Sequence, residues 1–313
     1  MPYSKSSLGR YDMSRPAVSV IIPTHNRANL LERAIRSVLA QTFEDFELLV
    51  VDDASTDNTP EVVESIEDGR LRYIRLKENS GAPVARNTGI KKSRGKFIAF
   101  LDDDDEWLPL RLEVQIKKFE ELDRSFGVVY GGFYYVSQEG GKILGKNIPK
   151  FRGDVYLHLL RENFVGSPTL LIRRECFKKA GLFDPFLTSS QDWDMWLRIA
   201  KYYKFDYVKE IVAKYYVHGR QISFNLNKYI PGRERFIKKH LDIRMNPKIM
   251  SIHLSQMGVL LLLGGSAEKG LKYIARSIAM APFNIESYTK LLELALDSRS
   301  VEYIKKILHF GRD

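Results

Sequence analysis

The first hundred residues alternate between short apolar runs and amphipathic segments. Three runs, at residues 17–23, 46–51 and 96–101, are rich in Val, Ile, Leu and Phe, as in strands buried on both faces. Residues 71–76 form a fourth strand-like segment. Between the first two runs, apolar side chains recur with the offsets of one helix face, at Leu31, Ala34, Ile35, Val38 and Leu39. The pattern therefore predicts strands separated by helices.

Further helices are predicted at residues 82–92 and 110–122. A short helix is predicted from residue 59, because Thr59 suits an N-cap and Pro60 and Glu61 suit a first turn. Strands that alternate with helices build βαβ units and a mainly parallel sheet. The expected fold class is α/β, a Rossmann-like sheet flanked by helices. In such sheets, ligands bind beyond the carboxyl ends of the strands.

The remainder of the chain is mixed and then helical. Strands are predicted at residues 128–136, with Gly131-Gly132 at a bulge or close backbone approach, and at 169–172. A helix is predicted at residues 192–203, and helices predominate from about residue 239, including 286–296 and 301–309. We therefore expect a flexible N-terminus (1–15), an α/β domain (16–240) and an all-α extension (241–313). One apparent unit of the extension weakly resembles a tetratricopeptide hairpin.

Hydrophobic residues make up 44% of the 313 residues, which suffices for a sizeable core. The chain carries 49 Lys and Arg against 39 Asp and Glu, a net charge of +10. The surplus is concentrated at residues 141–181 and 201–239. These blocks either form a solvated surface or face anions such as phosphates, lipid head groups or nucleic acid. Because no helix-turn-helix, zinc-finger or aromatic RNA-binding motif occurs, a nucleic-acid partner is not expected.

Cys176 is the only cysteine, which excludes an internal disulfide and a cysteine-cluster zinc site. We expect it to be a small buried residue rather than a nucleophile. The first 15 residues lack the apolar core of a signal peptide, and no apolar run approaches the roughly 20 residues of a membrane span. We expect a cytoplasmic protein whose contact with a membrane, where there is one, is peripheral at the inner face.

Four consecutive aspartates, Asp102 to Asp105, directly follow the strand at residues 96–101. Adjacent carboxylates repel one another, and a hard divalent cation would relieve that repulsion. The alternative is a solvated acidic loop before the next helix, but the position after a buried strand favours the metal. Neither a Walker A sequence nor G-x-G occurs in the chain. A phosphate-binding site would therefore use metal, side chains and helix N-termini.

Five motifs occur in order along the first two thirds of the chain. They are residues 23–27 (PTHNR), 51–57 (VDDASTD), 79–87 (NSGAPVARN), 100–105 (FLDDDD) and 191–198 (QDWDMWLR). Together they resemble family 2 glycosyltransferases with the GT-A fold, over roughly residues 17–220. That family transfers a sugar from a nucleotide-diphosphate donor to an acceptor hydroxyl and inverts the anomeric centre.

The resemblance implies a site for a nucleotide-sugar (NDP-sugar) donor at the first four motifs. His25 would lie beside the base, and Asp53 would accept a hydrogen bond from the base edge. UDP is the expected nucleotide from the family alone. The residues implied for donor binding are Pro23, Thr24, His25, Asn26, Arg27, Asp53, Arg86, Asn87, Asp102 and Asp103.

The resemblance also implies a metal site for Mn²⁺ or Mg²⁺. Asp102 and Asp104 form the D-x-D pair, with Asp104 as the best metal ligand and Asp103 reaching the ribose. His218 lies where relatives often place a histidine near the metal or diphosphate, although a surface histidine on a basic loop is the equal alternative. Arg220 nearby could bind donor phosphate.

Asp192 matches the family's catalytic base. Its neighbours Trp193 and Trp196 could exclude water and raise the pKa of its carboxylate. The alternative is an N-cap for the following helix. The preceding position is usually Glu in the family and is Gln191 in this chain, which can hydrogen bond but adds no charge. Residues 133–135 (FYY) could line an acceptor site, although core packing is the better expectation.

The expected function is therefore a metal-dependent inverting glycosyltransferase for glycan, polysaccharide or glycolipid synthesis, with a glycan or lipid-linked acceptor. Because the Q-x-x-R-W motif of processive synthases is absent, single addition is expected. One alternative is a sugar nucleotidyltransferase, which would use a glycine-rich N-terminal loop that the chain lacks. The other is a non-catalytic scaffold whose helical tail recruits a partner.

Overall fold

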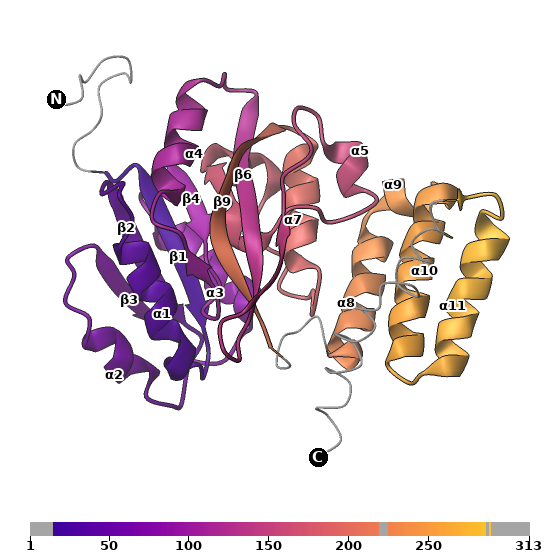
Figure 1. The fold of residues 1–313 in the computed structure, drawn as a ribbon, viewed down its shortest axis with the longest axis horizontal. Coiled ribbons are helices and arrows are strands. Elements are labelled where there is room, and N and C mark those ends of the chain that lie inside the picture. The colour runs from indigo at the N-terminus through magenta and orange to yellow at the C-terminus, as the bar shows by residue number, and fades with distance from the viewer. Residues whose placement is uncertain (1–14, 219–224, 286–287, 289–313) are drawn as a thin grey trace.

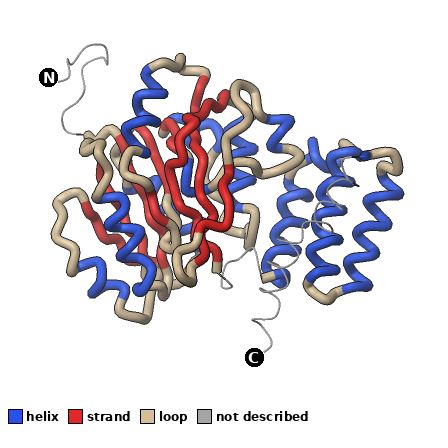
Figure 2. Tube along the Cα trace, in the orientation of Figure 1, coloured by secondary structure: helices blue, strands red, loops and turns tan. Residues whose placement is uncertain are grey.

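The computed structural model describes residues 15–218, 225–285 and 288. Its centre is one nine-stranded sheet with helices packed on both faces, and a group of helices lies beyond one side of the sheet (Figures 1 and 2). The GT-A type of α/β fold is thus confirmed, with an all-α C-terminal region. The predicted helices at 286–296 and 301–309 lie almost wholly outside the described residues.

The sheet has the strand order β3-β2-β1-β4-β8-β6-β9-β5, with β7 paired to β6. Its first half, β3 to β4, is entirely parallel. In the second half β8 is antiparallel to both of its neighbours, whereas β6 and β9 are parallel. The strands are β1 (Val18–Thr24), β2 (Phe46–Asp52), β3 (Leu71–Arg75), β4 (Phe97–Phe100), β5 (Glu106–Trp107), β6 (Phe126–Ser137), β7 (Ile143–Asn147), β8 (Leu171–Arg173) and β9 (Lys204–Val217).

Two cores explain why the central strands are apolar throughout. Along β1, Val20 and Ile22 face one core, and Ile21 faces the other. The first core lies under α1 (Ala28–Leu39), α2 (Thr59–Glu64) and α4 (Arg111–Glu120). The second core lies under α3 (Ala82–Lys92), α6 (Glu175–Ala180) and α7 (Gln191–Ala200), and the short α5 (Tyr156–Leu159) contributes Leu159 to it. A 3-10 helix, η1 (Ser167–Thr169), precedes β8.

The C-terminal helices share the second core. They are α8 (Leu226–Lys239), α9 (Leu241–Arg244), α10 (Pro247–Leu263) and α11 (Ala267–Met280). Phe236 of α8 packs on Trp193 of α7 with ring centroids 5.1 Å apart, so apolar contact is continuous between α7 and α8. The boundary predicted at residue 240 falls between α8 and α9, and the division into domains stays a prediction.

The unpredicted elements of the second half include β9 and α8, besides the short β7, α5 and α6. Strand β9 carries three Lys, one Glu and one Asp, and its pairing with β6 is not visible in the periodicity of the sequence. Helix α8 contains Pro231 and Gly232, which argue against a helix in an isolated sequence. The predicted irregularity at Gly131-Gly132 is confirmed, because the β6–β9 register shifts there and a Cβ on Gly131 would lie 2.7 Å from Val212.

One predicted cap was wrong by a residue. Thr59 is the first residue of α2, and Asn58 occupies the cap position without a side-chain hydrogen bond. The Asp57 carboxylate instead accepts from the Thr59 amide at 3.1 Å and from its hydroxyl at 2.6 Å. Asp57, two residues before the helix, therefore provides the capping hydrogen bond that was expected from Thr59.

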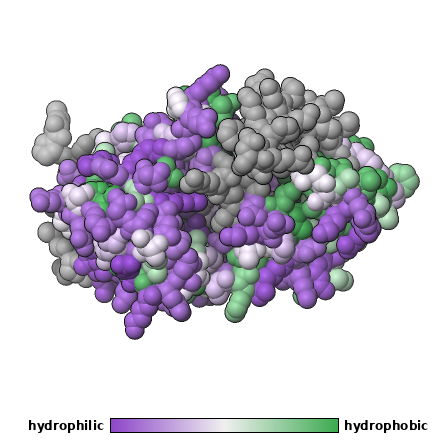
Figure 3. Space-filling model, turned by 90° about the horizontal axis from the view of Figure 1, so that it is seen from below, coloured by the Kyte–Doolittle hydropathy of each residue, from purple (hydrophilic) through white to green (hydrophobic). Residues whose placement is uncertain are grey.

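The surface differs between the two parts of the molecule. Hydrophilic side chains dominate the visible face of the α/β part, whereas hydrophobic ones gather toward the C-terminal helices (Figure 3). Exposed apolar residues at the end of that region include Leu271, Met280, Phe283 and Ile285. None of the described helices is long and apolar enough to cross a membrane.

Candidate active site

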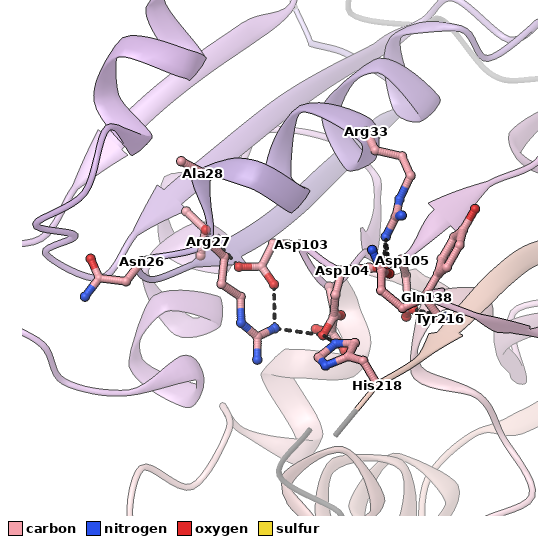
Figure 4. Close-up of polar contacts among 12 residues, drawn as sticks. Asn26, Arg27, Ala28, Arg33, Asp103, Asp104, Asp105, Gln138, Tyr216 and His218 are labelled. Carbon is pink, nitrogen blue, oxygen red and sulfur yellow. Dashed lines mark hydrogen bonds and ion pairs between the residues drawn. The ribbon is translucent and has the colours of Figure 1, made fainter. Parts of the chain in front are cut away.

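The four aspartates lie at the carboxyl end of β4, and arginines reach them from two sides. Arg27 Nη1 lies 2.9 Å from Asp103 Oδ1 and 2.7 Å from Asp104 Oδ2 (Figure 4). Arg86 Nη2 lies 2.6 Å from Asp102 Oδ1. The predicted electrostatic repulsion is therefore relieved in this structure by two guanidinium groups, one from the loop after β1 and one from α3.

The pKa values of the three buried aspartates, Asp103, Asp104 and Asp105, are shifted in different directions. Burial raises the pKa of Asp103 to about 6, against the attraction of Arg27. Burial also favours the neutral form of Asp104, but the hydrogen bond to His218 and the charge of Arg27 outweigh it and lower the pKa of Asp104. Burial and the charges of Asp104 and Asp102 raise the pKa of Asp105 well above its usual range. Asp104 is thus the buried member of the run best able to stay ionised.

Asp105 has a structural role. Its Oδ1 accepts from the Tyr216 amide at 2.9 Å, and this bond ties the acidic run to β9. Arg33 of α1 donates to the Asp104 carbonyl, and its guanidinium carbon lies 3.6 Å from the centre of the Tyr216 ring (Figure 4). The backbone of the acidic run is therefore held between α1 and β9.

His218 approaches Asp104 from the end of β9, 114 residues further along the chain. Its Nε2 lies 2.9 Å from Asp104 Oδ2 (Figure 4). The histidine predicted as a metal ligand is therefore beside the predicted aspartate and not on a free surface loop. Arg220 lies outside the described residues.

A carboxylate and an imidazole that converge in this way suit Mn²⁺ or Mg²⁺ only if other ligands complete the shell. The described residues contain no group of three or more His, Cys, Asp or Glu side chains that could hold a metal ion. Hard divalent ions are commonly held by one or two carboxylates together with substrate phosphates and water. Asp104 and His218, with Asp102 close by, fit a metal that arrives with the donor.

The loop after β1 is fixed to the loop after β2. Asn26 has φ +52°, and its Oδ1 accepts from the Thr56 amide at 2.7 Å. Thr24 donates to Asp103 Oδ2 at 2.8 Å, whereas Pro23 lies inside β1 opposite Val51. Left-handed backbone at a non-glycine residue is costly and is retained where the surrounding bonds demand it.

His25 lies at the mouth of this loop. Its Nδ1 is 2.7 Å from the Asp53 carbonyl, so Nδ1 must carry the proton and donate. Its Nε2 is 2.8 Å from Asn79 Nδ2 and therefore accepts. The hydrogen bonds fix both the tautomer and the ring plane, which suits a ring that stacks on a base.

The Asp53 carboxylate binds the turn that leads into α3. It accepts from the Ser80 amide at 2.8 Å and from the Gly81 amide at 2.6 Å. Gly81 has φ +89°, which favours glycine at this position. In this structure the Asp53 carboxylate stabilises the turn at residues 79–81. The predicted contact between Asp53 and the edge of the nucleotide base stays a prediction.

Arg86 and Asn87 are neighbours on α3 with different roles. Arg86 bonds to Asp102 and donates from Nη1 to Gln191 Oε1 at 3.2 Å, so one side chain joins the acidic run to α7. Asn87 instead forms two bonds of 2.8 Å with the backbone of Phe183. The structure thus uses Asn87 to hold the segment before α7, and its contact with the nucleotide stays a prediction.

Asp192 is the second residue of α7. The cap position belongs to Ser190, whose φ is +56°, so the N-cap alternative for Asp192 does not hold. Asn163 Nδ2 donates to Asp192 Oδ2 at 2.9 Å. Burial raises the pKa of Asp192, against the charge of Arg86, as the neighbouring tryptophans led us to expect. A carboxylate held in place with a raised pKa has the properties of a general base.

Two further residues at the site were not predicted from the sequence. Asn163 lies in a loop with no recognisable motif, and its role follows only from its contact with Asp192. Tyr215 stands on β9, and burial together with the charges of several site carboxylates raises the pKa of its hydroxyl well above its usual range. Its ring packs on Phe133 and Tyr135 at centroid distances of 5.9 Å, so the aromatic run of β6 supports Tyr215.

Comparison with known proteins identifies the family of the chain. The sequence profile of "Glycosyl transferase family 2" matches residues 19–181. The chain belongs to glycosyltransferase family 2. The match covers the acidic run and ends before Asp192, so α7 lies outside the matched region.

Two relatives illustrate the sequence similarity. An uncharacterised glycosyltransferase of Rickettsia prowazekii is 34% identical over 212 residues, which cover 66% of this chain and 66% of that protein. TuaG of Bacillus subtilis, a putative teichuronic acid biosynthesis glycosyltransferase, is 34% identical over 214 residues, 67% of this chain and 83% of TuaG. The chain thus spans about two thirds of the rickettsial relative, and 36% of a longer one from Rickettsia felis.

Solved structures show the same fold at low sequence identity. TarS 1-349 of S. aureus in complex with UDP-GlcNAc has a TM-score of 0.59 at 18% identity, over 94% of this chain and 91% of that one. The mannosyltransferase PcManGT of Pyrobaculum calidifontis, in complex with GDP-Man and Mn²⁺, has a TM-score of 0.53 at 20% identity, over 95% and 85%. The coverage extends the structural likeness into the C-terminal helices.

Proposed function

We propose that this protein is a metal-dependent inverting glycosyltransferase that moves a sugar from an NDP-sugar to an acceptor hydroxyl. The observation that carries the proposal is the bridge made by Arg86. It bonds Asp102 in the acidic run and Gln191 beside Asp192, so the donor motif and the candidate base face one site. Membership of glycosyltransferase family 2 supports the reaction class.

Asp192 acts as the general base. It takes the proton of the acceptor hydroxyl while that oxygen forms a bond to the anomeric carbon. The bond from that carbon to the β-phosphate oxygen breaks on the opposite side, and its electron pair leaves with the nucleoside diphosphate. Asn163 holds one oxygen of Asp192, and the raised pKa makes the carboxylate a better proton acceptor.

Asp104 and His218 would hold the metal ion, with Asp102 beside them. A bound Mn²⁺ or Mg²⁺ supplies Lewis acidity for the negative charge that develops on the diphosphate. Arg27 and Arg86 add positive charge at the same place from the chain itself. His25 stacks beside the base, and Asp53 with the loop after β1 borders the nucleoside.

The donor is expected to be a UDP-sugar, and the acceptor a glycan or a lipid-linked glycan. TuaG, whose name refers to teichuronic acid biosynthesis, supports a role in polysaccharide synthesis. The basic blocks of the sequence would favour a peripheral position at an anionic membrane. Liposomes that contain anionic lipid should then bind the protein at low salt and release it at high salt, and no binding at low salt would remove the membrane part of this proposal.

The reaction is tested with a panel of UDP- and GDP-sugars, with and without Mn²⁺. The expected result is slow, metal-dependent release of one nucleoside diphosphate from one donor, and faster release when a suitable acceptor is added. Asp104→Ala and Asp192→Asn should each abolish transfer and leave the circular dichroism spectrum unchanged. Asp242→Asn, on the exposed surface of α9, is the matched control and should retain activity.

Each alternative has its own outcome in this assay. Formation of pyrophosphate from a nucleoside triphosphate and a sugar phosphate would favour a nucleotidyltransferase. A well-folded protein that neither binds nor turns over any donor would favour a non-catalytic scaffold. Near-normal transfer by either Asp104→Ala or Asp192→Asn would contradict the proposed role of that residue.

A further inference from the structure

A buried arginine of α8 packs against the residue that follows the candidate base. Arg233 is 1% exposed, and its guanidinium carbon lies 3.7 Å from the centre of the Trp193 ring. Its Nη2 is 2.7 Å from His253 Nδ1 and 3.2 Å from Gln256 Oε1, both on α10. The C-terminal helices therefore place a guanidinium group directly behind the first turn of α7.

This guanidinium group is only partly satisfied. Among the described residues, its buried Nε and Nη1 have no hydrogen-bond partner. His253 does not neutralise it, because His253 Nε2 lies 2.8 Å from the Leu160 carbonyl and donates to it, which leaves Nδ1 as an uncharged acceptor. Burial lowers the pKa of Arg233 to about 10, so the group stays charged at neutral pH, and the carboxylate whose charge reaches it is Asp192.

Helix α8 also contacts the turn that precedes Asp192. A Cβ on Gly232 would lie 2.4 Å from the Ser189 amide nitrogen, so α8 approaches this turn as closely as a glycine permits. Thr188 Oγ1 donates to the Lys228 carbonyl and Ser189 Oγ to the Tyr229 carbonyl, each at 2.8 Å. These bonds lie beside Pro231, where a helix loses regular backbone bonding.

A buried charge without an ionic partner costs stability, and apolar residues of similar volume often replace such groups without loss. Folding alone therefore does not require a guanidinium group at position 233. Its stack on Trp193 fixes the start of α7, and its charge favours the ionised form of the neighbouring carboxylate.

We propose that Arg233 is a positioning residue for Asp192, through which the C-terminal helices take part in the transfer reaction. The proposal rests on the proposed function, because it needs Asp192 to be the base. It gives the helical region a role at the catalytic step rather than in binding the donor, whose candidate site lies at the loops after β1, β2 and β4 and at α3.

Several groups surround Asp192 and set its protonation. Arg86 of α3 and Arg233 of α8 favour the carboxylate, whereas Asp102 after β4 opposes it. Asn163 donates a hydrogen bond, and Tyr215 of β9 is neutral. Removal of one of the two positive charges should raise the pKa of Asp192. Activity should then be lost at low pH first, because the base must be deprotonated to act.

The test compares Arg233→Met with Arg111→Met in the full-length protein. Arg111 is a matched control, since it is fully buried, lies 3.4 Å from the Trp107 ring centre and also has unpartnered Nε and Nη1 atoms among the described residues. Its pKa is lowered by burial alone, with no carboxylate contributing. Any general effect of removing a buried arginine should appear in both variants.

For Arg233→Met we expect kcat to fall about tenfold at pH 7, the donor KM to change less than about twofold and the acidic limb of the kcat–pH profile to move to higher pH. The melting temperature should not fall relative to Arg111→Met. Arg233→Lys, which keeps the charge, should restore the position of the acidic limb.

Two results would overturn the proposal. One is an Arg233→Met enzyme with wild-type kcat and pH profile. The other is a loss of activity that is equal at every pH and follows a loss of melting temperature, since that describes a purely structural residue. If the wild-type protein itself turns over no donor, the proposed function fails and this proposal falls with it, an outcome that the wild-type assay alone reveals.

Discussion

The replacement of Asp194 by Asn should weaken the contact between α7 and the C-terminal helices. Asp194 is fully buried on α7, one residue beyond Trp193. Its Oδ1 is 2.9 Å from both His240 Nε2 and Lys239 Nζ, and its Oδ2 is 2.8 Å from Arg198 Nη2. One carboxylate therefore holds cationic or hydrogen-bonding groups from α7, α8 and the residue after α8.

The size of this stabilisation follows from the pKa of Asp194. Burial would raise it, but the bonds to His240 and Lys239 and the charge of Arg198 lower the pKa of Asp194 from 3.8 to about 2. At about 1.36 kcal/mol for each pKa unit, ionised Asp194 contributes about 2 kcal/mol to the free energy of unfolding. Because the folded pKa is depressed, this contribution is complete well above pH 4, about half by pH 3 and lost below pH 2.

Denaturation by guanidinium chloride at pH 7 measures the free energy of unfolding of the wild type and of the variant. Asp194→Asn should lower the free energy of unfolding by about 2–3 kcal/mol, because the cationic partners also lose their counter-charge. The difference from wild type should shrink as the pH falls toward 3. Asp242→Asn is the control, since Asp242 bonds Lys201 at 3.3 Å on the exposed surface, and such pairs contribute about 0–1 kcal/mol.

Equal losses in the two variants, or a difference that does not depend on pH between 7 and 3, would refute this account of Asp194. In the first case the buried carboxylate would contribute no more than a surface ion pair. In the second case its contribution would come from shape and packing rather than from ionisation.

Three further predictions follow from single contacts. Gly232→Ala should lower the free energy of unfolding by about 1–3 kcal/mol in chemical denaturation, because its Cβ would meet the Ser189 backbone; an unchanged midpoint would contradict that packing. Asn163→Ala should lower kcat about tenfold with donor KM retained, since the lost hydrogen bond to Asp192 is worth about 1.5 kcal/mol, and unchanged turnover would remove Asn163 from the site. The Cys176 thiol is buried and its pKa is raised by burial, so a thiol reagent should label it only after denaturant is added; fast labelling of the native protein would show that it is accessible.

The sequence by itself determined the first half of the sheet and the location of the donor motifs. The runs at 46–51 and 96–101 are buried on both faces, so their composition identifies them as central strands, and β2 and β4 match them within one or two residues. Because parallel strands end at one edge of the sheet, the loops after β1, β2 and β4 had to converge. The five motifs then indicated the family that the profile match confirmed.

The sequence could not reveal β9, because a strand with charged residues along both faces has no period of its own, and its partner β6 defines it. His218 follows β9, so its contact with Asp104 across 114 residues depends on that pairing. The aspartates suggested a metal from their mutual repulsion, but which positive groups lie beside them was decided in three dimensions, where Arg27 and Arg86 reach them from other segments.

The C-terminal helices show most clearly the difference between what sequence patterns predict and what only tertiary packing reveals. Composition and periodicity predicted a helical region, but Pro231 and Gly232 concealed helix α8. Only packing reveals that Gly232 permits α8 to touch the turn before Asp192 and that Arg233 lies behind Trp193. Local pattern determines which segments become strands and helices, whereas the electrostatic environment of a carboxylate is set by the groups that distant segments bring within a few ångströms of it.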